Sequence, residues 1–123
     1  MSDYLLIVDD EEDLREILKL SAETLFSGSI HLAKSGNEAV AIVQKEGKPL
    51  ACISDYRMPD GGGEVIYHFL EKNYLGTPFI FCSGCDLEEI RQKLPSIESY
   101  IAKPAIHDAL LAFLQQHIHA NAA

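Results

Sequence analysis

The sequence predicts a doubly wound α/β domain, in which helices cover both faces of a parallel sheet. Apolar runs of strand length alternate five times with segments of helical period, which is typical of repeated β-α units. Two runs, Leu5–Val8 and Phe79–Phe81, are apolar at every position, as expected for central strands that are covered on both sides. A length of 123 residues fits one domain, which we expect to span residues 1–123.

The expected strands lie at regular intervals along the chain. They are Tyr4–Val8, Ser29–Ala33, Leu50–Ser54, Pro78–Cys82 and Ser99–Ala102. The spacing of apolar residues by three and four predicts a helix after each strand. The first helix is expected to bury Leu14, Ile17, Leu18, Ser21 and Leu25.

The other four helices are bounded by glycine or proline. The second, about Gly36–Glu46, is expected to bury Ala39, Val40 and Val43 and to stop at Gly47; the third follows Gly61–Gly63 and buries Val65, Ile66, Phe69 and Leu70. The fourth, about Leu87–Leu94, is short and ends at Pro95; the fifth follows Pro104 and buries Leu110, Leu111, Leu114 and Ile118.

Composition excludes several classes of function. The net charge of −9 disfavours direct binding to nucleic acid or to an anionic membrane surface. No apolar run approaches the roughly 20 residues that cross a bilayer, and no basic signal-peptide region is present, so we expect a cytoplasmic protein without membrane contact. Three cysteines are then expected to be reduced thiols, with Cys52 as a core residue.

Polar residues follow four of the expected strands. Asp9 and Asp10 follow the first, Asp55 the third, Ser83 the fourth and Lys103 the fifth. Ligands of open parallel sheets bind outside the carboxyl ends of the strands, so these side chains should meet at one edge. Three neighbouring carboxylates repel one another unless a cation lies among them, and Mg²⁺ suits carboxylates, waters and phosphate oxygens. An aspartate beside Mg²⁺ and a lysine is a nucleophile suited to a phosphoryl group.

Each of these residues also has an ordinary structural interpretation. The acidic run Asp9–Asp13 is typical of a solvated helix start, Asp55 of a turn, Ser83 of a helix cap and Lys103 of a surface charge. Because all of them converge on one edge, the functional interpretation is favoured.

The sequence resembles the receiver domains of bacterial response regulators over nearly its whole length. The resemblance rests on Val8-Asp9-Asp10-Glu11, on Asp55-Tyr56-Arg57-Met58-Pro59 with Gly63, on Ser83-Gly84 and on Lys103-Pro104. It implies a flavodoxin-like fold, with a five-stranded parallel sheet in the order 2-1-3-4-5 and five helices. The sequence departs from the family at Gly62, where an acidic or polar residue often begins the third helix, so that cap is expected to be weak.

The resemblance also implies a role for each site residue. Asp55 accepts a phosphoryl group from a histidine kinase or a histidine phosphotransfer protein. Asp10 binds Mg²⁺ directly and Asp9 through water, while Asp55 and the backbone carbonyl of Arg57 complete the protein ligands. Lys103 binds the phosphoryl group, and Ser83 and Tyr100 form the switch.

Output and signal lifetime follow from the same resemblance. The surface of the fourth and fifth helices would contact an output protein, an effector domain or a second copy of the chain. The protein would not be an enzyme, beyond Mg²⁺-dependent self-phosphorylation and slow autodephosphorylation. Arg57 and Cys85 flank the approach of the hydrolytic water. Arg57, taken as exposed and not preorganised, is expected to shield the phosphoryl group and lengthen its lifetime.

Three other functions compete with this interpretation. Cys82-Ser83-Gly84-Cys85 has the C-x-x-C spacing of a dithiol redox module, but that function explains none of the carboxylates. A phosphohydrolase of the haloacid-dehalogenase type would need an acid at position 57, where this chain has Arg57. A zinc site at His117 and His119 lacks a suitably spaced cysteine pair.

Overall fold

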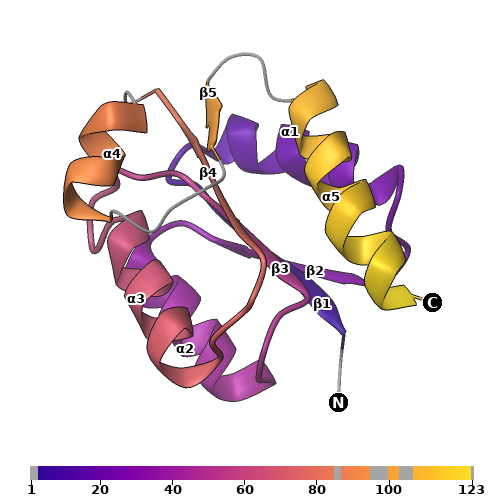
Figure 1. Cartoon of the computed structure of the whole chain (residues 1–123), viewed down its shortest axis with the longest axis horizontal. Coiled ribbons are helices and arrows are strands. Elements are labelled where there is room, and N and C mark those ends of the chain that lie inside the picture. Colours follow the sequence, from indigo (N-terminus) through magenta and orange to yellow (C-terminus); the bar gives the residue numbers. More distant parts are fainter. Residues whose placement is uncertain (1–2, 85–86, 95–99, 103–106, 123) are drawn as a thin grey trace.

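Strands and helices alternate along the whole chain in a computed structural model, which describes residues 3–84, 87–94, 100–102 and 107–122 (Figure 1). The strands are β1 (Tyr4–Val8), β2 (Ser29–Ala33), β3 (Ala51–Ser54), β4 (Phe79–Ser83) and β5 (Tyr100–Ala102). The helices are α1 (Glu12–Glu23), α2 (Gly36–Glu46), α3 (Gly63–Asn73), α4 (Leu87–Lys93) and α5 (His107–Ala122).

The five strands form one parallel sheet in the order β2-β1-β3-β4-β5. The predicted α/β class with a parallel sheet is confirmed. Val8, the last residue of β1, pairs with Ala33 at the end of β2 and with Ser54 at the end of β3. These three neighbouring strands therefore end at the same level, so the residues that follow them start from one edge of the sheet.

Two strands have boundaries that differ by one residue from those predicted. β3 begins at Ala51 rather than Leu50, and β4 runs from Phe79 to Ser83 rather than from Pro78 to Cys82. The shift in β4 arises because Ser83 still pairs with Ala102 of β5, so Ser83 is the last residue of the strand and not the first of the loop. The predicted start of β5 at Ser99 lies outside the described residues.

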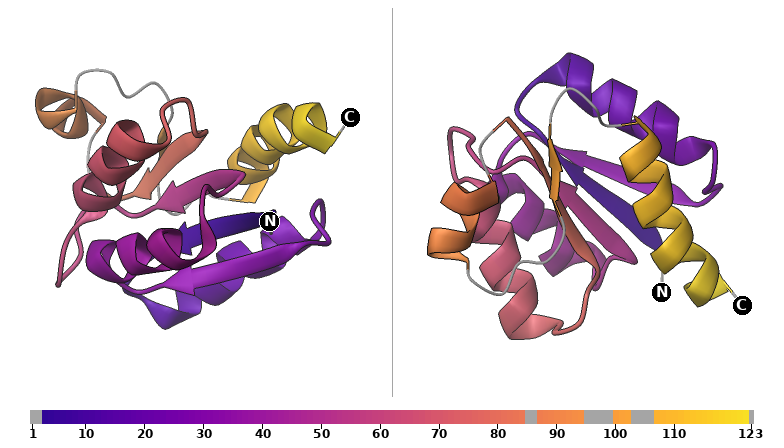
Figure 2. Two further views of the ribbon diagram at one scale, coloured as in Figure 1. Left: turned by 90° about the horizontal axis from the view of Figure 1, so that it is seen from below. Right: turned by 45° about the horizontal axis from the view of Figure 1, so that its top comes forward.

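Helices cover both faces of the sheet, with α1 and α5 on one face and α2, α3 and α4 on the other (Figures 1 and 2). The core under α1 and α5 contains Leu5, Ile7, Leu18, Ala22, Ala51, Ile53, Ile80, Cys82, Leu110, Phe113 and Leu114. The core under α2 and α3 contains Tyr4, Leu6, Val8, Ala33, Ala39, Val43, Cys52, Ile66 and Leu70. A separate small cluster under α4 contains Tyr56, Phe81, Ile90 and Leu94.

The inward faces of α1 and α5 differ from the prediction at Ile17, Ala22 and Phe113. Ile17 was expected to be buried, but 46% of its surface is exposed, because the buried side of α1 is centred on Leu18, Ser21 and Ala22. On α5, Phe113 is buried and packs with Leu110 and Leu114, although the prediction did not include it. Leu14 and Leu25 pack against the same core as expected.

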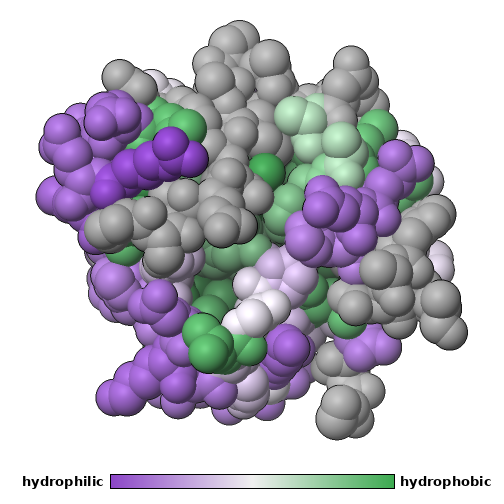
Figure 3. Space-filling view, in the orientation of Figure 1, coloured by the Kyte–Doolittle hydropathy of each residue, from purple (hydrophilic) through white to green (hydrophobic). Residues whose placement is uncertain are grey.

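Hydrophilic residues cover the helices at the left of Figure 3, and hydrophobic residues appear in the middle of that face. Among the helices in the described part of the chain, none has the length and apolar character needed to span a membrane.

The first prediction concerns the core under α2 and α3. Replacing the fully buried Leu6 by alanine leaves a cavity between the sheet and the helices. We therefore expect Leu6→Ala to lower the free energy of unfolding by about 2–5 kcal/mol. The same change at Leu75, which is 81% exposed, is a matched control and should alter it by less than about 0.5 kcal/mol. Urea unfolding measures both. Equal effects of the two substitutions would contradict this assignment of the core.

Candidate functional site

Three aspartates meet at the carboxyl ends of β1 and β3. Asp9 and Asp10 directly follow β1, and Asp55 directly follows β3. The backbone amide of Asp55 donates to the carbonyl of Val8 at 2.8 Å, and that of Asp9 donates to the carbonyl of Ala33 at 3.0 Å. One carboxylate oxygen from each aspartate lies within 4.8 Å of the other two. The structure thus brings together the three carboxylates that the sequence analysis singled out.

Backbone amides orient the two buried carboxylates of this cluster. Asp9 is fully buried and Asp55 is 8% exposed, whereas Asp10 is open to solvent. The Asp9 carboxylate accepts a hydrogen bond from the amide of Glu11 at 2.9 Å, and that of Asp55 accepts one from the amide of Tyr56 at 2.7 Å. Arg15 donates to the backbone carbonyl of Asp9 at 2.7 Å. Because buried polar groups are costly unless they are hydrogen-bonded, the two amide bonds help to compensate the burial of these carboxylates, and the Arg15 bond holds the backbone of Asp9.

The donor set of this cluster fits a hard divalent cation. All three ligand atoms are carboxylate oxygens, which suit Mg²⁺ and not a metal that prefers nitrogen or sulfur. The exposed Asp10 lies on the solvent side of the cluster, where Mg²⁺ can keep the waters it sheds reluctantly. Within the described part of the chain, no other three metal-ligating side chains gather in this way.

The loop between Asp55 and α3 is held by close backbone contacts. The amide of Gly63 donates to the carbonyl of Tyr56 at 2.7 Å. A Cβ atom on Gly63 would overlap the carbonyl oxygen of Asp55, and one on Gly62 would overlap that of Tyr56. Gly62 is the N-cap of α3 and makes no side-chain cap bond, consistent with the weak cap expected there. The two glycines therefore let α3 begin directly against the backbone of Asp55 and Tyr56.

Arg57 is paired with α4, which the sequence analysis did not foresee. Its guanidinium lies 2.5 Å from the carboxylate of Glu89, and its side chain is 67% exposed. The arginine is exposed, as expected, but its guanidinium is paired with Glu89, a contact that the prediction did not include. The pair lies in the lining of a groove of about 250 Å³. The lining residues are Tyr56, Arg57, Met58, Gly62, Glu64, Glu89 and Lys93. No local pattern indicates a pair 32 residues apart, since it requires the tertiary placement of α4.

The remaining predicted site residues are described only in part. Ser83 is 1% exposed and lies at the carboxyl end of β4, the edge at which Asp9 and Asp55 lie. Tyr100 begins β5, but its side chain lies outside the described residues, as do Lys103 and Cys85. The roles of these residues therefore stay predictions.

The described residues give little support to the competing thiol and zinc sites. Cys82 is 1% exposed inside β4, and burial raises the pKa of the Cys52 thiol, which keeps that thiol protonated. His117 lies against the ring of Phe113, with ring centroids 4.7 Å apart, and belongs to no group of metal ligands among the described residues. The side chain of His119 lies outside the described part.

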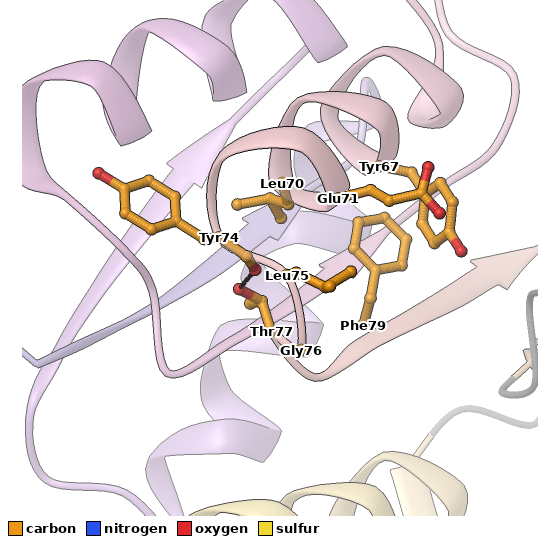
Figure 4. Close-up of a pocket in the computed structure, with 8 residues that line it drawn as sticks. All are labelled: Tyr67, Leu70, Glu71, Tyr74, Leu75, Gly76, Thr77 and Phe79. Carbon is orange, nitrogen blue, oxygen red and sulfur yellow. Dashed lines mark hydrogen bonds between the residues drawn. The ribbon is translucent and has the colours of Figure 1, made fainter.

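A second pocket lies at the opposite end of β4 (Figure 4). It has a volume of about 80 Å³ and is lined by Tyr67, Leu70, Glu71, Tyr74, Leu75, Gly76, Thr77 and Phe79. The hydroxyl of Thr77 donates to the carbonyl of Tyr74 at 2.6 Å, which closes the turn below it. This pocket contains one carboxylate, from Glu71, and none of the predicted site residues. The aspartate cluster is therefore the better candidate for chemistry.

Comparison with known proteins places the chain among response regulators. The chain is 30% identical to the chemotaxis protein CheY homolog of Campylobacter jejuni over 104 residues, which cover 81% of this chain and 80% of that protein. It is 33% identical over 73 residues to the response regulator protein PilR of Pseudomonas aeruginosa, covering 59% of this chain. The matched segment spans only 16% of the length of PilR.

Solved structures of a chemotaxis protein and of a two-component regulator have the same fold. A crystal structure of the chemotaxis protein CheY4 of Vibrio cholerae superposes with a TM-score of 0.80 at 25% identity, covering 95% of this chain and 99% of the other. A two-component transcriptional regulator AraC of Clostridium phytofermentans gives a TM-score of 0.77 at 30% identity, covering 98% of both chains. Residues 5–115 match the response regulator receiver domain, and the chain therefore belongs to that family.

Proposed function

We propose that this receiver domain accepts a phosphoryl group on Asp55 from a histidine kinase or a histidine phosphotransfer protein and passes the signal on by changing shape. The observation that carries the proposal is the gathering of the Asp9, Asp10 and Asp55 carboxylates within 4.8 Å at the carboxyl edge of the sheet. Membership of the response regulator receiver family supports a role in two-component signalling.

The side chain of Asp55 is arranged to act as a nucleophile. Its Oδ1 atom accepts the hydrogen bond from the Tyr56 amide, which fixes the carboxylate so that one of its oxygens can attack phosphorus in line with the leaving group. The bond from phosphorus to the donor nitrogen or oxygen then breaks, and an acyl phosphate remains on Asp55.

Asp9, Asp10, Asp55 and the backbone carbonyl of Arg57 would hold Mg²⁺. When bound, Mg²⁺ neutralises charge on the transferring phosphoryl oxygens. The ammonium group of Lys103 would bind the same oxygens. The protein does no other catalysis in this proposal: it phosphorylates itself from a donor and slowly hydrolyses the product.

In this proposal the signal leaves through the surface of α4 and α5, which lie on opposite faces of the sheet (Figures 1 and 2); we call this surface the α4–α5 face. The phosphoryl oxygens would draw in the hydroxyl of Ser83, which is buried at the end of β4, and Tyr100 at the start of β5 would move with it. We propose that the altered α4–α5 face binds an output protein, an effector domain or a second copy of the chain. The relatives whose names describe chemotaxis proteins and a response regulator fit such an output.

The second prediction tests the phosphoacceptor. With Mg²⁺ and acetyl phosphate, intact-mass spectrometry should detect one added phosphoryl group, because the chemistry belongs to the site and not to a kinase. Asp55→Asn should abolish the label, and Asp10→Ala should nearly abolish it by removing a metal ligand. Glu71→Gln, at the pocket on the opposite end of β4, is a control and should label normally. The same mass shift in Asp55→Asn would show that another residue is the acceptor.

The third prediction concerns the switch. Beryllofluoride, which mimics the phosphoryl group on the aspartate, should shift the NMR resonances of Ser83, Tyr100 and α4. The shifts are expected because α4 packs on Tyr56 and Phe81, which are close neighbours of Asp55 and Ser83 in the chain. Asp55→Asn is the control and should show no such shifts. If the complex forms with Asp55 and the resonances of α4 stay unchanged, the proposed output path is wrong.

The fourth prediction concerns the lifetime of the acyl phosphate. If Arg57 covers the phosphoryl oxygens, it must first leave Glu89, so Glu89 competes with the phosphoryl group for the guanidinium. Arg57→Asn should then speed hydrolysis, and Glu89→Gln should slow it by up to roughly fivefold, the range for an exposed ion pair. Decay is measured without kinase in excess Mg²⁺.

High salt provides an internal control for this fourth prediction. Screening weakens the exposed pair, so the wild-type lifetime should approach that of Glu89→Gln as salt rises. Slower hydrolysis in Arg57→Asn would show instead that the arginine assists the reaction.

A further inference from the structure

Asp60 ties the β3–α3 loop to the first turn of α2. The Asp60 carboxylate accepts hydrogen bonds from the hydroxyl of Ser35 at 3.2 Å and from the side-chain amide of Asn37 at 3.0 Å. Its backbone carbonyl accepts a third bond from the amide of Asn37 at 3.3 Å. Ser35 is itself fixed, because its oxygen caps α2 by accepting from the amide of Glu38 at 3.0 Å. Asp60 thus attaches the loop to a helix end that is itself held by the Ser35 cap.

The backbone of Asp60 has a conformation that few residues adopt. Its φ is +60°, and it is the only residue other than glycine with a positive φ among those that the structure describes. Aspartate and asparagine tolerate this left-handed region better than most side chains do. The bonds to Ser35 and Asn37 hold the residue there, and Gly61 continues the turn with a φ of +93°.

From this turn, a chain of close contacts leads to the phosphoacceptor. The amide of Gly36 donates to the carbonyl of Gly61 at 2.7 Å, and a Cβ atom on Gly36 would overlap the carbonyl of Gly62. Gly62 and Gly63 in turn press against the carbonyls of Tyr56 and Asp55. A displacement of the turn is therefore expected to move the backbone of residues 55 and 56, which Gly62 and Gly63 approach closely, and with it the following Arg57.

We propose that Asp60 is a positioning residue for the metal-binding loop. Gly62 supplies no side-chain cap to α3, and the loop is instead fastened to α2 by the bonds of Asp60 together with the backbone bond between Gly36 and Gly61. This attachment sets the position of the Arg57 carbonyl and the Asp55 carboxylate and thereby the affinity for Mg²⁺. The inference rests on the proposed function, in which those two groups are metal ligands.

The fifth prediction tests Asp60 with three substitutions that all remove its charge. Asp60→Asn keeps an acceptor for Asn37 and the tolerance for positive φ. The Mg²⁺ concentration that half-saturates this variant should therefore stay within about twofold of the wild-type value. Asp60→Gly keeps the backbone freedom but loses the side-chain bonds, and Asp60→Ala loses both. Both variants should need a roughly tenfold higher Mg²⁺ concentration for half-saturation, which is the low end of the range of effects for residues that orient metal ligands.

Mg²⁺ binding is measured by NMR titration of the whole chain, and labelling from acetyl phosphate is measured across the same range of Mg²⁺. The rate of labelling at saturating Mg²⁺ should stay within about twofold of wild type in Asp60→Asn and should fall in Asp60→Gly and Asp60→Ala, because the same displacement moves the Asp55 carboxylate. Asn37→Ala, which removes one partner from the α2 side, should act in the same direction as Asp60→Gly and keeps the result interpretable if Asp60→Ala folds poorly.

The outcomes separate this inference from the proposed function. If wild type neither binds Mg²⁺ nor labels on Asp55, the proposed function fails and the role of Asp60 fails with it. If wild type does both and Asp60→Gly titrates like wild type, Asp60 does not position the site. Lower stability in urea with an unchanged Mg²⁺ half-saturation would assign Asp60 a purely structural role. Weakening in Asp60→Asn equal to that in Asp60→Gly would show that charge alone matters, which also overturns the inference.

Discussion

The backbone amide of Asp55 donates to the carbonyl of Val8 across the β1–β3 pair, and this bond fixes the level at which the two strands end. Val8 pairs with Ser54 in the same register, so Asp9 and Asp55 leave the sheet side by side. A shift of one residue in either strand would turn one carboxylate to the opposite face. The apolar strands Tyr4–Val8 and Ala51–Ser54 are buried throughout, which makes such a shift costly. The position of the site is thus determined by the packing of β1 and β3, at some distance from the three carboxylates.

Three neighbouring carboxylates in a chain of net charge −9 repel one another. The fold offsets this with backbone donors, from Glu11 to Asp9 and from Tyr56 to Asp55, which orient the two buried carboxylates before any cation binds. Asp10 is left exposed on the solvent side. The cluster therefore combines two fixed ligands with an accessible one, an arrangement suited to a reversible cation and to a phosphoryl group that arrives from solution.

The parts of the site that follow strand ends could be predicted from sequence, because a parallel sheet brings the carboxyl ends of its strands to one edge whatever the loops do. Asp9, Asp10 and Asp55 are of this kind. Contacts made by loops could not be predicted in the same way. The pairing of Arg57 with Glu89 depends on where a seven-residue helix settles, and the bonds from Asp60 to Ser35 and Asn37 cross between two β-α units. The exposure of Ile17 similarly depends on which side of α1 meets the sheet and α5.

The small cluster under α4 connects the aspartate cluster to the proposed partner surface on α4. Ile90 and Leu94 pack on Tyr56 and Phe81, whose rings meet edge to face at 5.5 Å. Tyr56 also donates its amide to the Asp55 carboxylate. The two sides of α4 are consequently under different constraints. Its outer side, with Arg91 and Gln92, is exposed, whereas a change on its inner side would disturb Tyr56 and through it Asp55, the proposed phosphoacceptor. Redesign of the proposed partner surface should therefore be confined to the solvent side of α4.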